Sequence, residues 1–269
     1  MFSVFPPAAQ PSPMLFFKLL SAPVLILILT LLVRRYGPRV GGLALGVPLV
    51  AGPISIFMAL DHGAAFAATA AIGSLLGQAS ACVYCFAFAA ASRRLSVLPS
   101  VLAAVIAYAA CAALLNTHTW TLAPALALLL TLALLGVLIP AAPGDARTTV
   151  PSPWWDLPLR LLLAPVIILT ITTLSAHLSP QLSGIIAPVP VMILILGAFT
   201  LHRRGPTDAA IMMKAVVVGS LSFAAFFTVV GVFLGEGVMV LVYLAAAGAS
   251  IAVSGALYFL RRDAVAAPK

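Results

Sequence analysis

Long apolar segments alternate with short polar connections along almost the whole chain. The segments are dominated by Leu, Ala, Val and Ile, and Gly, Pro and small polar residues are scattered among them. About 20 apolar residues is the length that an α-helix needs to cross the hydrocarbon layer of a membrane. The pattern predicts about nine transmembrane helices, at 15–33, 41–60, 64–91, 98–115, 121–140, 157–175, 183–201, 208–234 and 238–260.

The same pattern favours helices over strands. In lipid every backbone N–H and C=O group must be hydrogen-bonded inside the protein, which restricts spanning structures to helices and closed barrels. Barrel strands would appear as short segments with alternating apolar and polar residues, and the sequence has no such series. The expected fold is all-α, a polytopic transmembrane helix bundle.

The polar connections fall into two sets that differ in charge. Alternate connections contain pairs of arginines, at 34–35, 93–94, 203–204 and 261–262, and the connection between the fifth and sixth segments contains Arg147 and Arg160. The other connections, at 61–63, 116–119, 176–179 and 235–237, contain no Lys or Arg. Cytoplasmic connections are enriched in Lys and Arg, so the N-terminus is expected outside and the C-terminus in the cytoplasm.

An internal repeat explains the odd number of segments. The stretch around Pro23 matches the stretch around Pro165 at an offset of 142 residues (165 − 23). Without a gap, the same offset pairs Pro38 with Pro180, Gly42 with Gly184, Pro48 with Pro190, Gly63 with Gly205, Gly77 with Gly219 and Ser80 with Ser222. Each repeat covers four segments and a fifth lies between them, so the sequence predicts two inverted four-helix repeats joined by a central helix.

This organisation divides the chain into five parts. Residues 1–13, rich in proline, are expected to be a disordered tail, or an upstream extension if translation begins at Met14. The other parts are membrane repeat one at 14–116, a linking helix and cytoplasmic linker at 117–156, membrane repeat two at 157–262, and a cytoplasmic tail at 263–269. The first segment is expected to stay uncleaved, because its positive charges follow the apolar stretch.

The repeat unit resembles the small four-helix bacterial membrane proteins of the GlpM-like type. The residues that carry the resemblance are Lys18, Arg35-Tyr36, Gly42-Leu43, Pro48 and Asp61-His62-Gly63. Repeat two departs from them, with Leu178 in place of the tyrosine and Arg203-Arg204-Gly205 in place of the acidic turn. The resemblance implies a fused, inverted duplication of such a unit and supports the architecture rather than an activity.

Composition agrees with a membrane protein and narrows its partners. The chain is 63% hydrophobic and 7% charged, with a mean hydropathy of +1.20. The expected partner is the lipid bilayer, and the net charge of +8 is split among connections, which argues against nucleic-acid binding. Three cysteines, Cys82, Cys85 and Cys111, lie in apolar segments and give no disulfide framework. Cys82 and Cys85 have the C-x-x-C spacing but are expected to pack rather than to form a redox or metal site, and no cofactor is expected.

Two paired prolines are candidates for a substrate pathway. Inverted repeats are common in secondary transporters, where the substrate lies near the midplane and paired helices are broken. Pro48 and Pro190 occupy equivalent positions in the second segment of each repeat. Proline removes a backbone donor and frees a carbonyl, so both helices are expected to break there for function, or only to bend.

A few polar side chains within the apolar segments extend this candidate pathway. Gln78 and Ser80 are paired by the offset with Ser220 and Ser222, and they either face one another at the pathway or link helices by hydrogen bonds. Lys214 either extends to the cytoplasmic surface or attracts an anion inside the membrane. No carboxylate lies at the centre of a segment, which argues against a buried acid that couples transport to protons or sodium.

These observations leave three hypotheses for function. The first is a small secondary transporter or exporter of a neutral, amphipathic or anionic small molecule. The second is a non-transporting accessory or scaffold protein that packs through small residues such as Ala103, Ala107 and Ala110. The third is an intramembrane enzyme, but the sequence has no H-E-x-x-H, G-x-S-x-G or P-loop motif and no acidic pair, so no enzymatic activity is expected. The expected location is the cell membrane, the inner membrane if the source is bacterial, and the sequence leaves homo-oligomerisation open.

Overall fold

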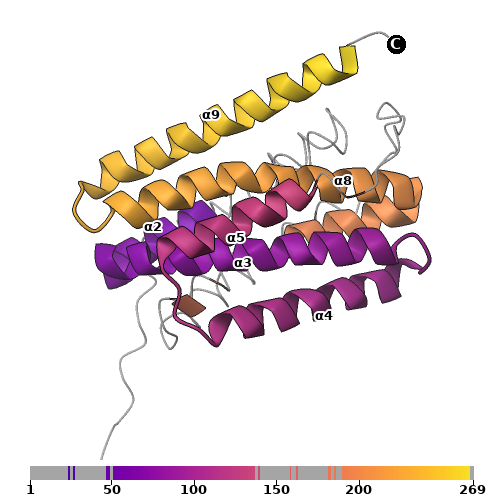
Figure 1. Cartoon of the computed structure of the whole chain (residues 1–269), viewed down its shortest axis with the longest axis horizontal. Coiled ribbons are helices and arrows are strands. Elements are labelled where there is room, and N and C mark those ends of the chain that lie inside the picture. The colour runs from indigo at the N-terminus through magenta and orange to yellow at the C-terminus, as the bar shows by residue number, and fades with distance from the viewer. Residues whose placement is uncertain are drawn as a thin grey trace, which may run out of the picture.

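The computed structural model describes residues 51–136 and 190–266 continuously, together with positions 24, 27, 47, 48, 139, 158, 162, 181, 182 and 185. This part of the chain is all-helical, and Figure 1 shows its elements. They are α2 (Ala51–His62), α3 (Ala64–Ala91), α4 (Val97–Asn116), α5 (Leu122–Leu135), α8 (Val191–Phe233) and α9 (Met239–Ala266). The predicted helices 15–33 and 157–175 lie outside the described residues, except for positions 24 and 27 in the first and 158 and 162 in the second. The predicted tail 1–13 and the connection 141–156 also lie outside them.

Four helices of the described part are long and apolar enough to cross a membrane. They are α3, α4, α8 from Met192 and α9 to Phe259. The predicted helices 64–91 and 98–115 match α3 and α4 to within one residue. The part of the chain that the structure describes is therefore all-helical, and the protein is a multi-pass membrane protein.

Helices α5 and α9 end at other residues than predicted. The helix predicted over 121–140 ends at Leu135 and has 14 residues, and the N–H of Gly136, which caps it, bonds to carbonyls of the last turn. The helix predicted to end at 260 continues as α9 to Ala266. A helix satisfies its own backbone hydrogen bonds, so α9 does not have to end where its sequence becomes polar.

Burial separates central helices from peripheral ones. Within an apolar stretch of 18 residues in each helix, 78% of the residues are buried in α3 and 61% in α8, compared with 11% in α4 and 22% in α9. The core between α3 and α8 contains large side chains that are fully buried, among them Leu75, Tyr84, Phe88, Met212 and Phe227. The outer surfaces of α4 and α9 expose large apolar side chains, including Leu98, Ile106, Leu244 and Ile251. Such surfaces suit contact with lipid chains rather than water.

Helix α8 folds back on itself at Gly205. This residue has φ 84° and ψ 179°, a conformation reserved almost entirely for glycine, and it separates helical segments at 191–204 and 206–233. A Cβ on Gly197 would lie 2.5 Å from the Met213 side chain, although sixteen residues of straight helix span about 24 Å. The polar connection predicted between 183–201 and 208–234 is thus a sharp reversal. Pro206 follows directly because the first helical position does not need a free N–H.

Gly63 forms a second reversal of the same kind, between α2 and α3. Its φ is 92° and its ψ 163°, and Gly63 and Gly205 are the glycines with positive φ in the described part. The offset that pairs them also matches α3 with the second segment of α8, because 64–91 corresponds to 206–233. It likewise matches the first residue of α4, Val97, with the first residue of α9, Met239.

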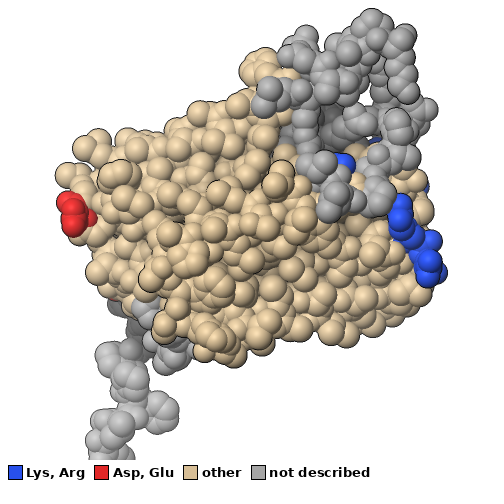
Figure 2. All heavy atoms as spheres, viewed as in Figure 1, with Lys and Arg blue, Asp and Glu red and all other residues tan. Residues whose placement is uncertain are grey.

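Charged side chains gather at the two ends of the bundle. Figure 2 shows Lys and Arg at the end where α3 turns into α4, and Asp and Glu at the end where α8 turns into α9. The first of these connections contains Arg93 and Arg94, and the second contains Glu236. The long tan surface between the ends is uncharged in this view, as expected for a surface that faces the hydrocarbon layer.

Candidate functional site

A buried polar contact joins α3 to the second segment of α8, near the middle of that segment. The Cys82 thiol donates a hydrogen bond to Ser220 Oγ over 3.6 Å, and the Ser220 hydroxyl donates to the carbonyl oxygen of Val217 over 2.6 Å. Both side chains are fully buried. The sequence singled out Ser220, whereas Cys82 was expected only to pack. The contact between Cys82 and Ser220 depends on how α3 and α8 are rotated about their axes, and the sequence does not specify that rotation.

Gln78 lies one turn before Cys82 on the same face of α3. Its side chain is 4% exposed, and Nε2 has no hydrogen-bond partner among the described residues. Leaving a buried donor unpaired costs about 1–3 kcal/mol, so native proteins usually reserve such a group for a water, an ion or a ligand. Gln78 is the predicted site residue whose hydrogen-bonding capacity is left open in this way.

Ser80 and Ser222 are both buried but do not bond to one another. The Ser80 hydroxyl donates to the carbonyl oxygen of Leu76 in its own helix over 3.1 Å. Ser222 accepts a hydrogen bond of 2.7 Å from the Ser254 hydroxyl, which links α8 to α9. The sequence left two roles open for these serines, lining a pathway or linking helices by hydrogen bonds. Ser222 links two helices in the structure.

Pro48 and Pro190 interrupt the helices that were predicted to run through them. Both are buried and non-helical, and a helix begins three residues after Pro48 and one residue after Pro190. The Pro48 carbonyl accepts from Gly52 N over 2.8 Å, and the Pro190 carbonyl accepts from Leu194 N over 2.7 Å. Of the two alternatives that the sequence left open at these prolines, a break and a bend, the structure has a break, where the ring removes the donor that a helix needs. The helices predicted over 41–60 and 183–201 are therefore not continuous through Pro48 and Pro190.

Lys214 is half-buried in the second segment of α8. Its Nζ donates to the carbonyl oxygen of Ile139 over 3.2 Å, just beyond the end of α5. The ammonium group is thus bonded to the chain that leaves α5. This placement brings Lys214 next to a cavity that the sequence gave no reason to expect.

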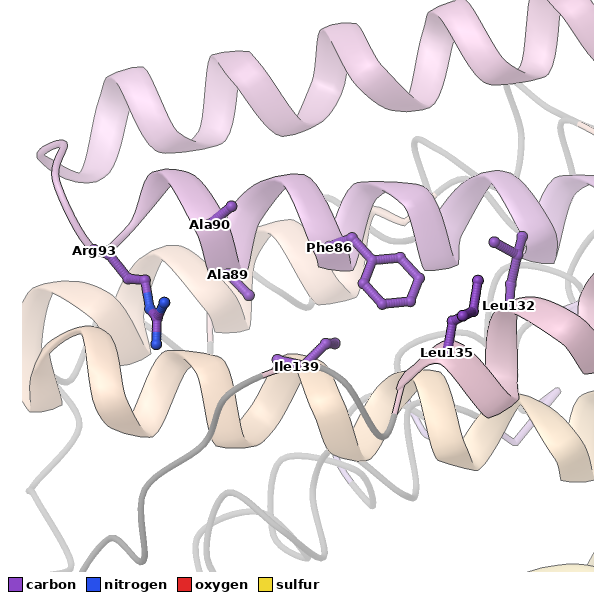
Figure 3. A pocket seen from close by; sticks show the side chains of 7 residues that line it. All are labelled: Phe86, Ala89, Ala90, Arg93, Leu132, Leu135 and Ile139. Carbon is purple, nitrogen blue, oxygen red and sulfur yellow. The ribbon is translucent and has the colours of Figure 1, made fainter.

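The cavity lies between the end of α3 and the end of α5 and has a volume of about 400 Å³ (Figure 3). Its walls are formed by Phe86, Ala89, Ala90, Arg93, Leu132, Leu135 and Ile139. In Figure 3 the Arg93 side chain reaches down from the α3–α4 connection at one end of the cavity. The predicted pathway residues do not line it.

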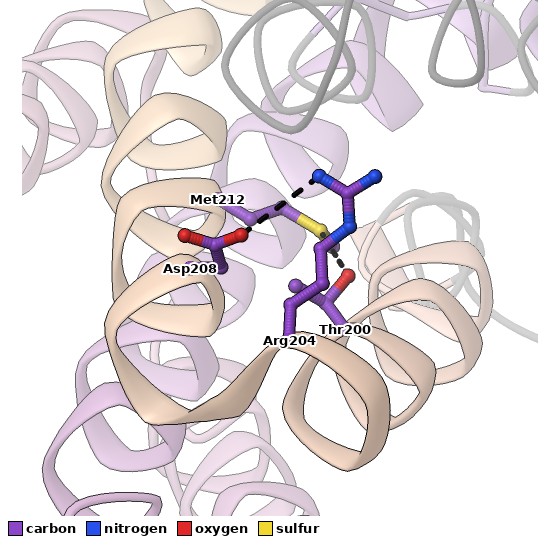
Figure 4. Close-up of polar contacts among 4 residues, drawn as sticks. All are labelled: Thr200, Arg204, Asp208 and Met212. Atoms are coloured by element: carbon purple, nitrogen blue, oxygen red, sulfur yellow. Dashed lines mark hydrogen bonds and ion pairs between the residues drawn. The ribbon is translucent and has the colours of Figure 1, made fainter. Parts of the chain in front are cut away.

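A second polar group lies at the reversal of α8 (Figure 4). Arg204 Nη1 is 3.8 Å from Asp208 Oδ2, and the Thr200 hydroxyl donates to Met212 Sδ over 3.4 Å. Each pair joins the segment before Gly205 to the segment after it. These contacts link the two segments, although Arg204 Nη1 is buried and has no hydrogen-bond partner among the described residues.

The described part offers no obvious metal site. Within it, no three His, Cys, Asp or Glu side chains lie close enough to share an ion. Cys82 and Cys85 are free thiols, fully buried in the core. Comparison of the chain with protein-family models, with curated proteins and with solved structures finds no significant match.

Proposed function

We propose that the chain is an inverted duplication of a four-helix unit, with nine membrane spans in total. The paired reversals at Gly63 and Gly205 and the paired ends of α3 and the second segment of α8 support this proposal. Hydrogen bonds repeat as well: Ser92 N bonds to Phe88 O, and at the same offset Leu234 N bonds to Val230 O. We also propose that each four-helix unit is similar to the GlpM-like membrane proteins.

The orientation follows from the charges. We propose that the end with Arg93 and Arg94 faces the cytoplasm and the end with Glu236 faces outside. The N-terminus is then outside and the C-terminus cytoplasmic. In a bacterial source the membrane is the inner membrane.

Within this architecture we propose that the protein is a small secondary transporter or exporter. The observation that carries the proposal is the Gln78 amide nitrogen, which has no hydrogen-bond partner in the described part of the chain. It lies beside the contact of Cys82 with Ser220 between corresponding helices of the two proposed halves. The interruptions at Pro48 and Pro190 add support, since broken helices and a midplane site accompany inverted repeats in transporters.

The proposed substrate is a small neutral, amphipathic or anionic molecule with a hydrogen-bond acceptor. Gln78 Nε2 is a donor, so it would bind an acceptor of the substrate. The carboxylates of the described part, Asp61, Asp208, Glu236 and Asp263, lie at or near helix ends rather than at mid-depth. A cationic substrate would lack a buried counter-charge there.

Access to Cys82 from the two sides of the membrane tests the proposal. The double variant C85A/C111A leaves Cys82 as the single thiol, and it is treated with a membrane-impermeant maleimide in right-side-out and in inverted vesicles. A transporter that alternates between two openings should be labelled in both preparations. The variant C82A/C85A/C111A gives the background.

A scaffold protein predicts a different result. Its peripheral helix α4, with the small residues Ala103, Ala107 and Ala110, would bind a partner while the core stays closed. Cys82 would then be protected in both preparations and react only after denaturation. A second reporter, Ser220→Cys in the cysteine-free chain, probes the same contact from α8. Protection of both thiols from both sides would exclude the transporter.

A further inference from the structure

The described residues around the cavity at the end of α3 form an apolar wall with one charged group. Of the seven described residues that line it, six are apolar and Arg93 supplies the charge. Its volume of about 400 Å³ lies in the range of small-molecule sites, which is about 300–1,000 Å³. An apolar space with one cation at its edge is complementary to an amphiphile with a negative head.

The position of the cavity places that cation at the membrane interface. Arg93 lies two residues beyond the end of α3, at the end of the bundle where the Lys and Arg side chains gather. Phe86 and Ala89 lie one to two turns deeper along the same helix, at the level of the lipid chains. A molecule in the cavity would therefore have its head near the headgroups and its tail beside the hydrocarbon layer.

One wall of the cavity is fixed by an internal hydrogen bond. Ile139 lines the cavity, and its carbonyl oxygen accepts the hydrogen bond from Lys214 Nζ. Behind it, Gly136 packs so closely on Val217 that a Cβ would come within 2.5 Å of Val217 Cγ1. The chain that leaves α5 is thus held against α8, which keeps the space beside α3 open.

We propose that this cavity binds one acyl chain of an anionic phospholipid, whose phosphate pairs with Arg93. Charge complementarity selects the anionic headgroup, and the apolar wall formed by Phe86, Leu132 and Leu135 accepts the chain. Arg94, the next residue, does not line the cavity. The proposal does not depend on transport, because it concerns lipid binding by the resting protein.

Native mass spectrometry of the purified protein tests this assignment. The protein in neutral detergent is mixed with equal amounts of phosphatidylglycerol and phosphatidylcholine, and the bound lipid is counted. We expect the wild type to retain one lipid molecule and to bind phosphatidylglycerol in preference to phosphatidylcholine. One interfacial cation contributes about 1 kcal/mol to binding an anionic lipid, so Arg93→Gln should lower this preference about fivefold. The matched control Arg94→Gln should leave it unchanged.

A second variant tests the apolar part of the cavity. Ala90→Trp fills the space from an exposed position on α3, and it should abolish retention of both lipids. If Ala90→Trp does not purify as a folded protein, Ala90→Leu should give a smaller loss in the same direction. Equal effects of Arg93→Gln and Arg94→Gln would overturn the proposal, as would equal retention of the two lipids by the wild type.

Discussion

Gly63 and Gly205, 142 residues apart, have nearly the same backbone conformation. Their φ angles are 92° and 84°, and their ψ angles are 163° and 179°. Each is the single residue at which one helix ends and the next begins in the opposite direction. The other residues at these turns differ, with His62 before the first glycine and Arg204 before the second. The backbone geometry is therefore repeated although the charge is not.

Alanine at either glycine should destabilise the protein. A Cβ at Gly63 or Gly205 would meet nothing within 4 Å, so the cost is backbone strain, about 1–3 kcal/mol for each substitution. Thermal unfolding of the purified variants measures it. Gly248→Ala is the matched control, because that helical glycine also has open space and should be neutral or slightly stabilising. Equal melting temperatures of Gly205→Ala and Gly248→Ala would contradict the assignment.

Gly136→Ala should destabilise the protein for a different reason. The new Cβ would lie 2.5 Å from Val217 Cγ1, and a valine in a helix has little freedom to rotate away. Overpacking of this kind costs about 1–3 kcal/mol. Val217→Ala creates room, so the double variant should recover part of the loss relative to the sum of the single variants. Strict additivity in thermal unfolding would show that the two residues are not in contact.

Lys214→Met should loosen the end of α5. Methionine keeps most of the apolar stem but removes the donor to the Ile139 carbonyl, a hydrogen bond from a charged group worth about 1.5–3 kcal/mol. Hydrogen exchange should become faster in the last turn of α5 and leave the middle of α3 unaffected. Lys214→Arg keeps a donor and serves as the control. Unchanged exchange in Lys214→Met would mean that this bond does not hold the chain.

Ser55 and Tyr243 should show measurable coupling. Their hydroxyl groups lie 2.9 Å apart and connect α2 to α9 inside the protein. Hydrogen bonds between membrane helices contribute about 0.6 kcal/mol on average, with a maximum near 1.7 kcal/mol. Ser55→Ala, Tyr243→Phe and the double variant form a cycle in which the double variant should lose less than the sum. A coupling energy indistinguishable from zero would contradict the contact.

The sequence predicted the ends of most described helices well. The bounds of α3 and α4 follow from where apolar stretches give way to polar connections, and these transitions reflect the thickness of the hydrocarbon layer. The pairing of Gly63 with Gly205 was also visible, because the offset aligned them. The breaks at Pro48 and Pro190 were among the alternatives that the prolines suggested.

The arrangement of the helices around one another could not be predicted. Helices α3 and α4 are apolar on all sides, so their sequences do not say that α3 is central and α4 peripheral. The contact of Cys82 with Ser220 and the cavity at Arg93 depend on helix rotation and on where α5 ends. Those features are set by the packing of small residues such as Gly136 against specific side chains, which no periodic pattern encodes.

The burial of α3 against α8 also has a consequence for biosynthesis. Ribosomes complete α3 more than one hundred residues before the second segment of α8 emerges. During that interval Gln78 and Cys82 have no partner from α8 and must face lipid, the translocon or the other helices already made. The first half therefore reaches its final packing only after the second half has inserted, and the two halves should assemble when they are produced as separate chains.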